Sequence, residues 1–160
     1  MFFAEMYSPV GRLVLESDGH FLTGLRIDVP PGADKVRRED LEVFRKTQLW
    51  LEGYFRGNPM VAEELPLMAE GTPFQQMVWE YLLQIPRGKT CTYGQIAREM
   101  GKKLGKEKMS AQAVGQAVGR NPIWIIIPCH RCMGAGGKLT GYAGGIEKKA
   151  WLLRHEEVEL

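Results

Sequence analysis

The residues best suited to chemistry lie together in the short sequence Pro128-Cys129-His130-Arg131-Cys132. This sequence follows the apolar run 123 to 127, which predicts a buried strand that ends at a reactive turn. A thiolate is a strong nucleophile, and nearby cations and backbone dipoles lower the pKa of a thiol from about 8.5. We therefore expect Cys129 to be a nucleophile whose pKa is lowered by His130 and Arg131.

A carboxylate near the end of the chain can complete this site. A last helix is predicted from the spacing of Ile146, Ala150, Trp151 and Leu153, and it brings Glu156 to its end. In a relay of thiol, imidazole and carboxylate, the carboxylate orients the imidazole, which takes the thiol proton. Glu156 is the candidate third member, although a charged C-terminal tail also explains its position.

The cysteines allow other interpretations. The chain has three, Cys91, Cys129 and Cys132, and we expect them to be thiols in a reducing compartment. Cys129 and Cys132 are spaced like a redox or metal pair, but there is no second such pair for zinc. A thioredoxin-like dithiol would also need alternating strands and helices before the motif. From the residues alone, a nucleophile, a redox or metal pair and an inert buried thiol all stay open.

Composition and charge are typical of a globular protein. Of the 160 residues, 44% are hydrophobic and 25% charged, which excludes collagen-like, disordered and disulfide-rich classes. The longest apolar run is far shorter than the roughly 20 residues that span a bilayer, and the N-terminus lacks the pattern of a signal peptide. We therefore expect a cytoplasmic protein. Residues 1–70 carry 8 Lys and Arg against 12 Asp and Glu, and residues 71–160 carry 13 against 7. The basic second part is a candidate phosphate-facing surface.

The chain is predicted to form two regions, residues 1–70 and 71–160. Three strands are expected in the first region, at Phe2 to Tyr7, Arg12 to Glu16 and Phe21 to Asp28, because turn residues separate these apolar runs. Apolar residues at near-helical spacing predict an amphipathic helix over residues 40 to 56. This first region contains no catalytic constellation.

Capping signals predict the helices of the second region. Thr72, Pro73 and Gln75 form a capping box with proline at the first helical position. A second box, Thr92 to Gln95, begins a shorter helix that is expected to end at Gly101. Ser110 can cap a third helix, built of small residues and ended by Asn121-Pro122. The second and third helices, joined by a Gly- and Lys-rich turn, form a candidate helix-turn-helix whose later helix would bind DNA.

A series of motifs identifies a family that this chain resembles. The chain is similar to the O6-alkylguanine-DNA alkyltransferases, also called methylated-DNA-protein-cysteine methyltransferases. The resemblance covers nearly the whole chain. Its most specific motifs lie in order in the second region: Gly71-Thr72-Pro73-Phe74-Gln75, Thr92-Tyr93-Gly94-Gln95-Ile96-Ala97, Ala113-Val114-Gly115, Asn121-Pro122, Pro128-Cys129-His130-Arg131 and Gly141-Tyr142-Ala143-Gly144-Gly145.

This resemblance implies an α+β protein that repairs DNA. A ribonuclease-H-like domain with a small antiparallel sheet and a helix would occupy residues 1–70. A mainly helical domain with a helix-turn-helix, residues 71–160, would enter the minor groove of double-stranded DNA. The alkylated base would be flipped out of the duplex, because its reactive carbon cannot be reached while stacked. The alkyl group of O6-alkylguanine would pass irreversibly to the enzyme, once per molecule, without cofactor or metal, and the protein would be a monomer. Acceptance of O4-alkylthymine stays open.

The resemblance also assigns roles to residues of this chain. Cys129 would attack the alkyl carbon, His130 would act as base through a water, and Glu156 would orient His130. Tyr93 would stabilise or protonate the departing guanine, and Asn121 would hold the turn that presents the cysteine. Substrate and DNA contacts would come from the helix-turn-helix, the cysteine motif and the loop that lines the pocket: Gln112, Ala113, Gly115, Arg120, Arg131, Tyr142, Ala143 and Gly144.

Two positions depart from the family pattern. Gln112 stands where the family commonly has an arginine that fills the space of the flipped base, so we expect weaker DNA binding or flipping, with Arg120 or Lys108 as compensating cations. Cys132 stands where a small apolar residue is usual; it could pair with Cys129 on oxidation or fill an apolar site. An alternative from another class is a non-catalytic, alkyltransferase-like protein that only binds lesions, but such proteins lack the nucleophilic cysteine.

Overall fold

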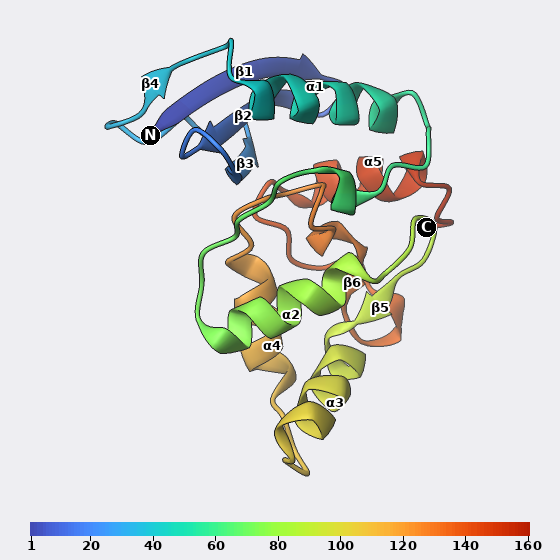
Figure 1. Ribbon diagram of the computed structural model, residues 1–160. Coiled ribbons are helices and arrows are strands. Elements are labelled where there is room, and N and C mark those ends of the chain that lie inside the picture. Colours follow the sequence, from blue (N-terminus) through green and yellow to red (C-terminus); the bar gives the residue numbers. More distant parts are fainter. The chain divides into compact units, whose positions relative to one another are not determined.

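Short turns connect the strands of a small four-stranded sheet. The strands β1 (Phe2–Ser8), β2 (Gly11–Ser17), β3 (Leu22–Ile27) and β4 (Val36–Arg37) lie in the order β3-β2-β1-β4 (Figure 1). Gly11 begins β2 with φ 126°, a conformation that glycine adopts readily. The three predicted strands are confirmed. However, β4 runs parallel to β1, so the sheet is mixed and not purely antiparallel as expected.

Helix α1 (Glu42–Phe55) covers this sheet and confirms the helix predicted over residues 40 to 56. Its apolar stripe includes Phe44 and Leu51, which are fully buried together with Leu13, Leu15 and Leu25 of the sheet. A 3₁₀ helix, Ala62–Glu64, follows, and Trp50 donates its indole N–H to the carbonyl of Val61 at 3.0 Å. Burial of these apolar side chains is the main stabilising contribution to this part of the chain.

The structure is a computed structural model that describes all 160 residues, and the chain divides into two compact units. The first comprises Met1–Glu70 with Pro122–Ile126, and the second comprises Gly71–Asn121 with Ile127–Leu160. The apolar run after Asn121 therefore leaves the second unit for five residues. No helix is long and apolar enough to cross a membrane.

The predicted buried strand at residues 123 to 127 is wrong. Leu25 donates to the carbonyl of Pro122 and accepts from the N–H of Trp124, both at 2.9 Å, so only a single bridge forms with β3. The chain then turns, because the N–H of Ile126 donates to the carbonyl of Trp124 at 2.8 Å across Ile125. Ile125 has φ 71°, which is rare for a β-branched residue. The run is buried, as expected, but it is not extended.

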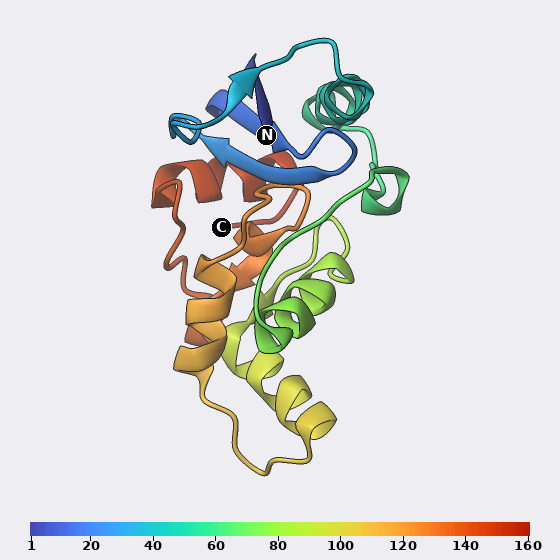
Figure 2. The same cartoon turned by 60° about the vertical axis from the view of Figure 1, so that its left-hand side comes forward.

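Four helices make up about half of the second unit. They are α2 (Pro73–Leu83), α3 (Tyr93–Leu104), α4 (Ala111–Gly119) and α5 (Ile146–His155), and Figure 2 shows α2, α3 and α4 from a second side. Two-residue strands β5 (Cys91–Thr92) and β6 (Cys132–Met133) pair in parallel, and 3₁₀ helices lie at Cys129–Arg131 and Ala135–Gly137. The α+β fold class is confirmed.

Side-chain caps begin three of these helices as predicted. Thr72 and Thr92 each accept from the backbone N–H three residues later, and the glutamine at that position bonds back to the threonine N–H. Ser110 caps α4 by accepting from Ala113. Each cap satisfies backbone donors that have no partner within the helix. The second box matters most for the site, because it fixes where α3 begins and hence where Tyr93 lies.

Helix α3 is longer than expected. It was predicted to end at Gly101, but it continues to Leu104, and Gly105 provides the left-handed C-cap with φ 68°. Gly101 is glycine for another reason: a Cβ there would lie 3.0 Å from the carbonyl oxygen of Lys106. The small residue permits close packing of the following turn against the helix. Small residues act similarly in α4, where Trp79 of α2 donates to the carbonyl of Ala117 at 2.9 Å.

Candidate active site

The 3₁₀ helix Cys129–Arg131 presents the predicted nucleophile. Cys129 is 6% exposed, and its N–H donates to the carbonyl of Ile127 at 2.8 Å. The buried amide of Asn121 donates to the same carbonyl at 2.9 Å and also hydrogen-bonds the Cys129 side chain. Asn121 therefore holds both the Ile127 carbonyl before the turn and the thiol, in the role that the resemblance implies.

The thiol of Cys129 is harder to ionise than the sequence suggested. Burial raises its pKa to about 11, against the opposing effects of the Asn121 hydrogen bond and the positive charge of Lys149. The expectation of a lowered pKa is wrong, because loss of hydration outweighs the charge of Lys149 and the hydrogen bonds from Asn121 and the His130 backbone. At neutral pH Cys129 is therefore a thiol, and a base must remove its proton before it can attack.

His130 and Glu156 form the predicted pair. Nε2 of His130 lies 2.7 Å from Oε2 of Glu156, and both side chains are fully buried. Burial alone would raise the pKa of Glu156, but His130 and Arg131 reverse this and hold it well below its usual range. The ionised carboxylate can only accept, so Nε2 carries the hydrogen. Burial also lowers the pKa of His130, which leaves the imidazole neutral at physiological pH.

The second ring nitrogen of His130 is the basic one. Nδ1 is buried and has no protein hydrogen-bond partner. With the hydrogen on Nε2, the lone pair of Nδ1 can take a proton from a neighbouring donor. The arrangement therefore holds a neutral general base next in sequence to a thiol that needs one.

Arg131 lies inside the protein, whereas the sequence analysis expected it among the DNA-contacting residues. Its guanidinium bonds both carboxylate oxygens of Glu156, at 2.8 and 3.0 Å, and donates to the carbonyl of Ile85 at 2.6 Å. Only 12% of its side chain is exposed. Arg131 and His130 therefore share Oε2 of Glu156, and the carboxylate joins the catalytic turn to the end of α5.

Tyr93, the first residue of α3, lies close to the cysteines. Burial raises its pKa to about 12, and its side chain also hydrogen-bonds Cys132. Two glycines lie beside it: a Cβ on Gly141 would lie 3.4 Å from its hydroxyl, and one on Gly115 would lie 3.8 Å from its ring, both ordinary contact distances. Tyr93 thus remains a protonated donor at neutral pH.

An open hollow of about 670 Å³ borders Tyr93. Gln112 and Gly115 of α4 line it, as the sequence predicts for a substrate-facing surface. The other lining residues come from the start of α3, the start of α4 and the second 3₁₀ helix: Thr92, Gly94, Arg98, Ala111, Ala135 and Gly136. Cys129 is not among its lining residues.

Other predicted contact residues lie outside the lining of this hollow. Arg120 is the C-cap of α4, at the opposite end of the helix from Gln112, so it does not replace the missing arginine there. Ala113 is half-buried in α4. Tyr142, Ala143 and Gly144 form a turn that is closed by the N–H of Gly145 and the carbonyl of Tyr142 at 2.9 Å.

The sequence of the second unit matches a known family. The DNA-binding domain of 6-O-methylguanine DNA methyltransferase matches residues 73–158, which is more than half of the chain. The chain belongs to the O6-methylguanine DNA methyltransferase family. The resemblance inferred from the motifs is confirmed, and so is the classification as a transferase.

Similarity to individual methyltransferases extends over both units. The methylated-DNA–protein-cysteine methyltransferase of Haemophilus influenzae is 39% identical, and the alignment covers 99% of this chain and 87% of that protein. The methyltransferase of Methanosarcina acetivorans is 44% identical, and the alignment covers 98% of this chain and 98% of that protein. The crystal structure of Mycobacterium tuberculosis OGT in complex with DNA superimposes with a TM-score of 0.86, at 41% identity, over 98% of this chain and 93% of that one.

Lys149 is a residue of the methyltransferase site that the sequence analysis missed. It is fully buried, and its ammonium donates to the carbonyls of Cys132, Thr140 and Gly141 at 2.5, 2.6 and 3.3 Å. Burial lowers its pKa. A signal was present in the sequence, because Lys149 lies seven residues before Glu156 and therefore on the same face of α5.

Cys132 has a different neighbour from the one considered. In the parallel pair β5 and β6 it is in register with Cys91, and both are buried free thiols. Their side chains are hydrogen-bonded to each other. The sequence left two roles open for Cys132, pairing with Cys129 on oxidation or filling an apolar site. In the structure it fills an apolar position beside Cys91. No group of three or more His, Cys, Asp or Glu side chains has the geometry to hold a metal ion.

Proposed function

We propose that this protein repairs DNA by moving the alkyl group of O6-alkylguanine irreversibly onto the sulfur of Cys129. Family membership supports this reaction. The observation that carries it is local: a buried thiol lies beside a neutral histidine whose Nε2 is bound to an ionised carboxylate. That arrangement suits a single proton removal followed by attack of sulfur on a saturated carbon.

The first step is removal of the thiol proton. Nδ1 of His130 takes it through a bridging water, and the imidazolium that forms is stabilised by Glu156. Asn121 and the charge of Lys149 favour the thiolate, since both oppose the effect of burial on the Cys129 pKa.

The second step transfers the alkyl group. The Cys129 thiolate attacks the alkyl carbon, a carbon–sulfur bond forms, and the bond from that carbon to O6 breaks with its electron pair going to guanine. Tyr93 donates a hydrogen bond to the departing base, which finally gains the proton lost by the thiol. The thioether product is stable, so each molecule reacts once.

The partner we propose is duplex DNA with an alkylated base. The Mycobacterium tuberculosis relative was crystallised with DNA, and an alkylated base must leave the stack before its alkyl carbon can reach the sulfur of Cys129. We further propose that the protein acts as a cytoplasmic monomer bound to chromosomal DNA. Size-exclusion chromatography with light scattering, with and without duplex, tests the monomer.

Intact-protein mass tests the reaction. Wild type and Cys129→Ser are incubated with a duplex that contains one O6-methylguanine. We expect one methyl group on the wild type, at Cys129 by peptide mapping, and none on the variant. Binding of the lesion without any gain in mass would instead indicate a non-catalytic lesion-binding protein.

A further inference from the structure

Cys91 and Cys132 lie opposite each other in the two-stranded sheet of the second unit. They are in register on the parallel strands β5 and β6 (Figure 1). Neighbouring strands are about 4.8 Å apart, which is within the range of about 4.4–6.8 Å that separates the Cα atoms of disulfide-bonded cysteines. Both thiols are free, and their side chains are hydrogen-bonded to each other. The strands therefore already have the spacing that a disulfide needs.

The hydrogen bond between these thiols makes Cys91 the easier one to ionise. It lowers the pKa of Cys91, and the positive charge of Lys149 acts in the same direction against the effect of burial. The same hydrogen bond raises the pKa of Cys132, which keeps its hydrogen. Because the thiolate is the form that attacks oxidants, Cys91 is the reactive member of the pair and Cys132 is the resolving one.

Cys129 has a different environment from this pair. Burial raises its pKa to about 11, and its side chain hydrogen-bonds Asn121. Cys91 is 8% exposed and Cys129 is 6% exposed, so both thiols have similar access and their ionisation decides which one reacts. The sequence allowed a disulfide between Cys129 and Cys132, but the structure gives Cys132 a partner in Cys91.

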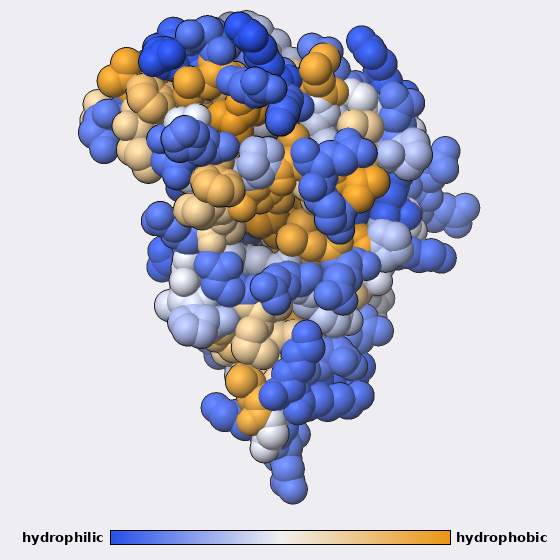
Figure 3. Space-filling view, in the orientation of Figure 1, coloured by the Kyte–Doolittle hydropathy of each residue, from blue (hydrophilic) through white to orange (hydrophobic).

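Burial of all three thiols restricts which oxidants have access to them. Figure 3 shows hydrophilic side chains gathered over α3, the helix that begins directly after β5. A sheet of two-residue strands has few backbone hydrogen bonds to break, and such segments open locally at low cost. A peroxide not much larger than water can enter through such an opening.

We propose that Cys91 and Cys132 take up the oxidising power of small peroxides as a reversible disulfide and so keep Cys129 reduced. The inference goes beyond the proposed function, which uses neither of these two cysteines. It concerns the state of the nucleophile before DNA is bound, because a Cys129 sulfur held in a disulfide cannot attack an alkyl carbon.

The oxidation proceeds in two steps. The Cys91 thiolate attacks one oxygen of hydrogen peroxide, the O–O bond breaks, and the hydroxide released takes up the proton that Cys91 had lost. Cys91 is then a sulfenic acid. The sulfur of Cys132 attacks the Cys91 sulfur, its own proton goes to the departing hydroxide, and the S–S bond forms. The two thiols lose two electrons in all, and the peroxide becomes two waters.

Thiol mapping after oxidation tests the proposal. Wild type, Cys91→Ala and Cys132→Ala are treated with equimolar hydrogen peroxide. Free thiols are alkylated, disulfides are reduced with dithiothreitol, and the thiols released are given a heavier alkyl label before peptide mass analysis. In the wild type, we expect the disulfide between Cys91 and Cys132 to exceed any that contains Cys129 by about tenfold or more, since a larger thiolate fraction outweighs the weaker nucleophilicity of a low-pKa thiol.

The two variants separate the roles of the pair. In Cys91→Ala we expect a larger share of Cys129 to be oxidised at the same dose, because the oxidant has no disulfide to form without it. In Cys132→Ala, oxidation should stop at the sulfenic acid of Cys91, which is detected as its adduct with dimedone. Cys91→Ser repeats the first comparison if the alanine variant does not fold.

The proposal makes the wild-type product and the effect of Cys91→Ala its two tests. Absence of a disulfide between Cys91 and Cys132 in the wild type, or a main product that joins Cys129 to Cys132, would overturn it. Equal oxidation of Cys129 in wild type and Cys91→Ala would overturn it as well. None of these measurements needs alkyl transfer, so their outcome is independent of the proposed function.

Discussion

Glu156 is the residue on which the site depends most, because one carboxylate holds both His130 and Arg131. In Glu156→Gln the amide can donate to Nε2, which moves the imidazole hydrogen to Nδ1 and removes the base. We expect the transfer rate to fall by about 10² or more, the usual contribution of a general base. Single-turnover assays with methylated duplex measure it.

Glu157→Gln is the matched control, since Glu157 is the next residue and is exposed. It should react at the wild-type rate. A Glu156→Gln protein as fast as this control would show that His130 is not the base.

The same pair makes folding stability depend on pH. Folding lowers the pKa of His130 from 6.5 and that of Glu156 from 4.5. Below these values the unfolded chain binds more protons than the folded one, so the stabilisation is present at neutral pH and is lost on acidification. We expect the free energy of unfolding in urea to decline as pH falls from 6.5 to 4.

A variant that carries both His130→Asn and Glu156→Gln should show a flatter pH profile over the same range. If the wild-type protein instead gained stability on acidification, the directions assigned to these two pKa values would be wrong.

For single residues, the sequence named Cys129, His130 and Glu156 as candidates but left other roles open, and the resemblance to a family assigned their roles. The sign of the Cys129 pKa shift was not predictable, because burial depends on tertiary packing. Arg131 was misplaced for the same reason: an arginine in a reactive motif can face solvent or a buried carboxylate. Lys149 was overlooked because lysine is rarely fully buried.

Among the elements, α5 connects the catalytic turn to the segment at Thr140 and Gly141. Lys149 binds the carbonyl of Cys132 on one side and those of Thr140 and Gly141 on the other. In Lys149→Met these buried acceptors lose their donor, which costs about 1–3 kcal/mol for each one left unsatisfied. We expect a loss of about 2 kcal/mol or more in the free energy of unfolding, and slower transfer.

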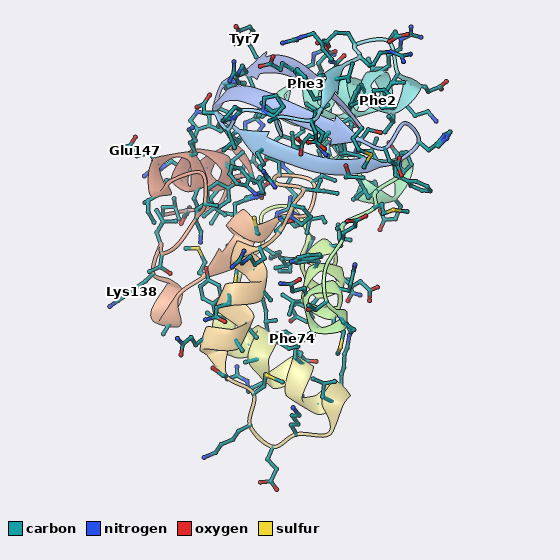
Figure 4. The ribbon with its side chains drawn as sticks, turned by 90° about the vertical axis from the view of Figure 1, so that its left-hand side faces the viewer. Phe2, Phe3, Tyr7, Phe74, Lys138 and Glu147 are labelled. Carbon is teal, nitrogen blue, oxygen red and sulfur yellow. The ribbon has the colours of Figure 1, made fainter.

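Lys138→Met is the control, because Lys138 projects outward from the second unit (Figure 4). Urea denaturation of the two variants should differ clearly. Equal stability would mean that water replaces the Lys149 ammonium at no cost.

Local signals predicted most elements well. The boxes at Thr72 and Thr92 gave correct helix starts, since capping depends on residues within one turn. The prediction of a strand at residues 123 to 127 was wrong. An apolar run without Gly or Asn carries no local signal for the turn at Ile125. Strand β4 has only two residues, too few to leave a pattern, and the end of α3 was misplaced because Gly101 serves packing.

For the whole molecule, the reaction changes the protein permanently. A methyl group on Cys129 adds volume at a position that is only 6% exposed. Overpacking of this kind costs about 1–3 kcal/mol. We expect the methylated protein to unfold at a temperature several degrees lower than the unreacted one, measured by scanning calorimetry after removal of DNA.

Cys129→Ser protein exposed to the same methylated duplex is the reference for this comparison and should not change. A methylated protein with an unaltered or higher unfolding temperature would mean that the site has room for the added group.

Residues 122–126 belong to the first unit, so one cut in the gene cannot separate the two units cleanly. A gene fusion, duplication or domain exchange that copied only residues 71–160 would carry Ile123, Trp124, Ile125 and Ile126 without the Leu25 strand that pairs with them. These large apolar side chains would then favour aggregation. A gene fragment that begins at residue 71 should therefore give a less soluble protein than the whole chain.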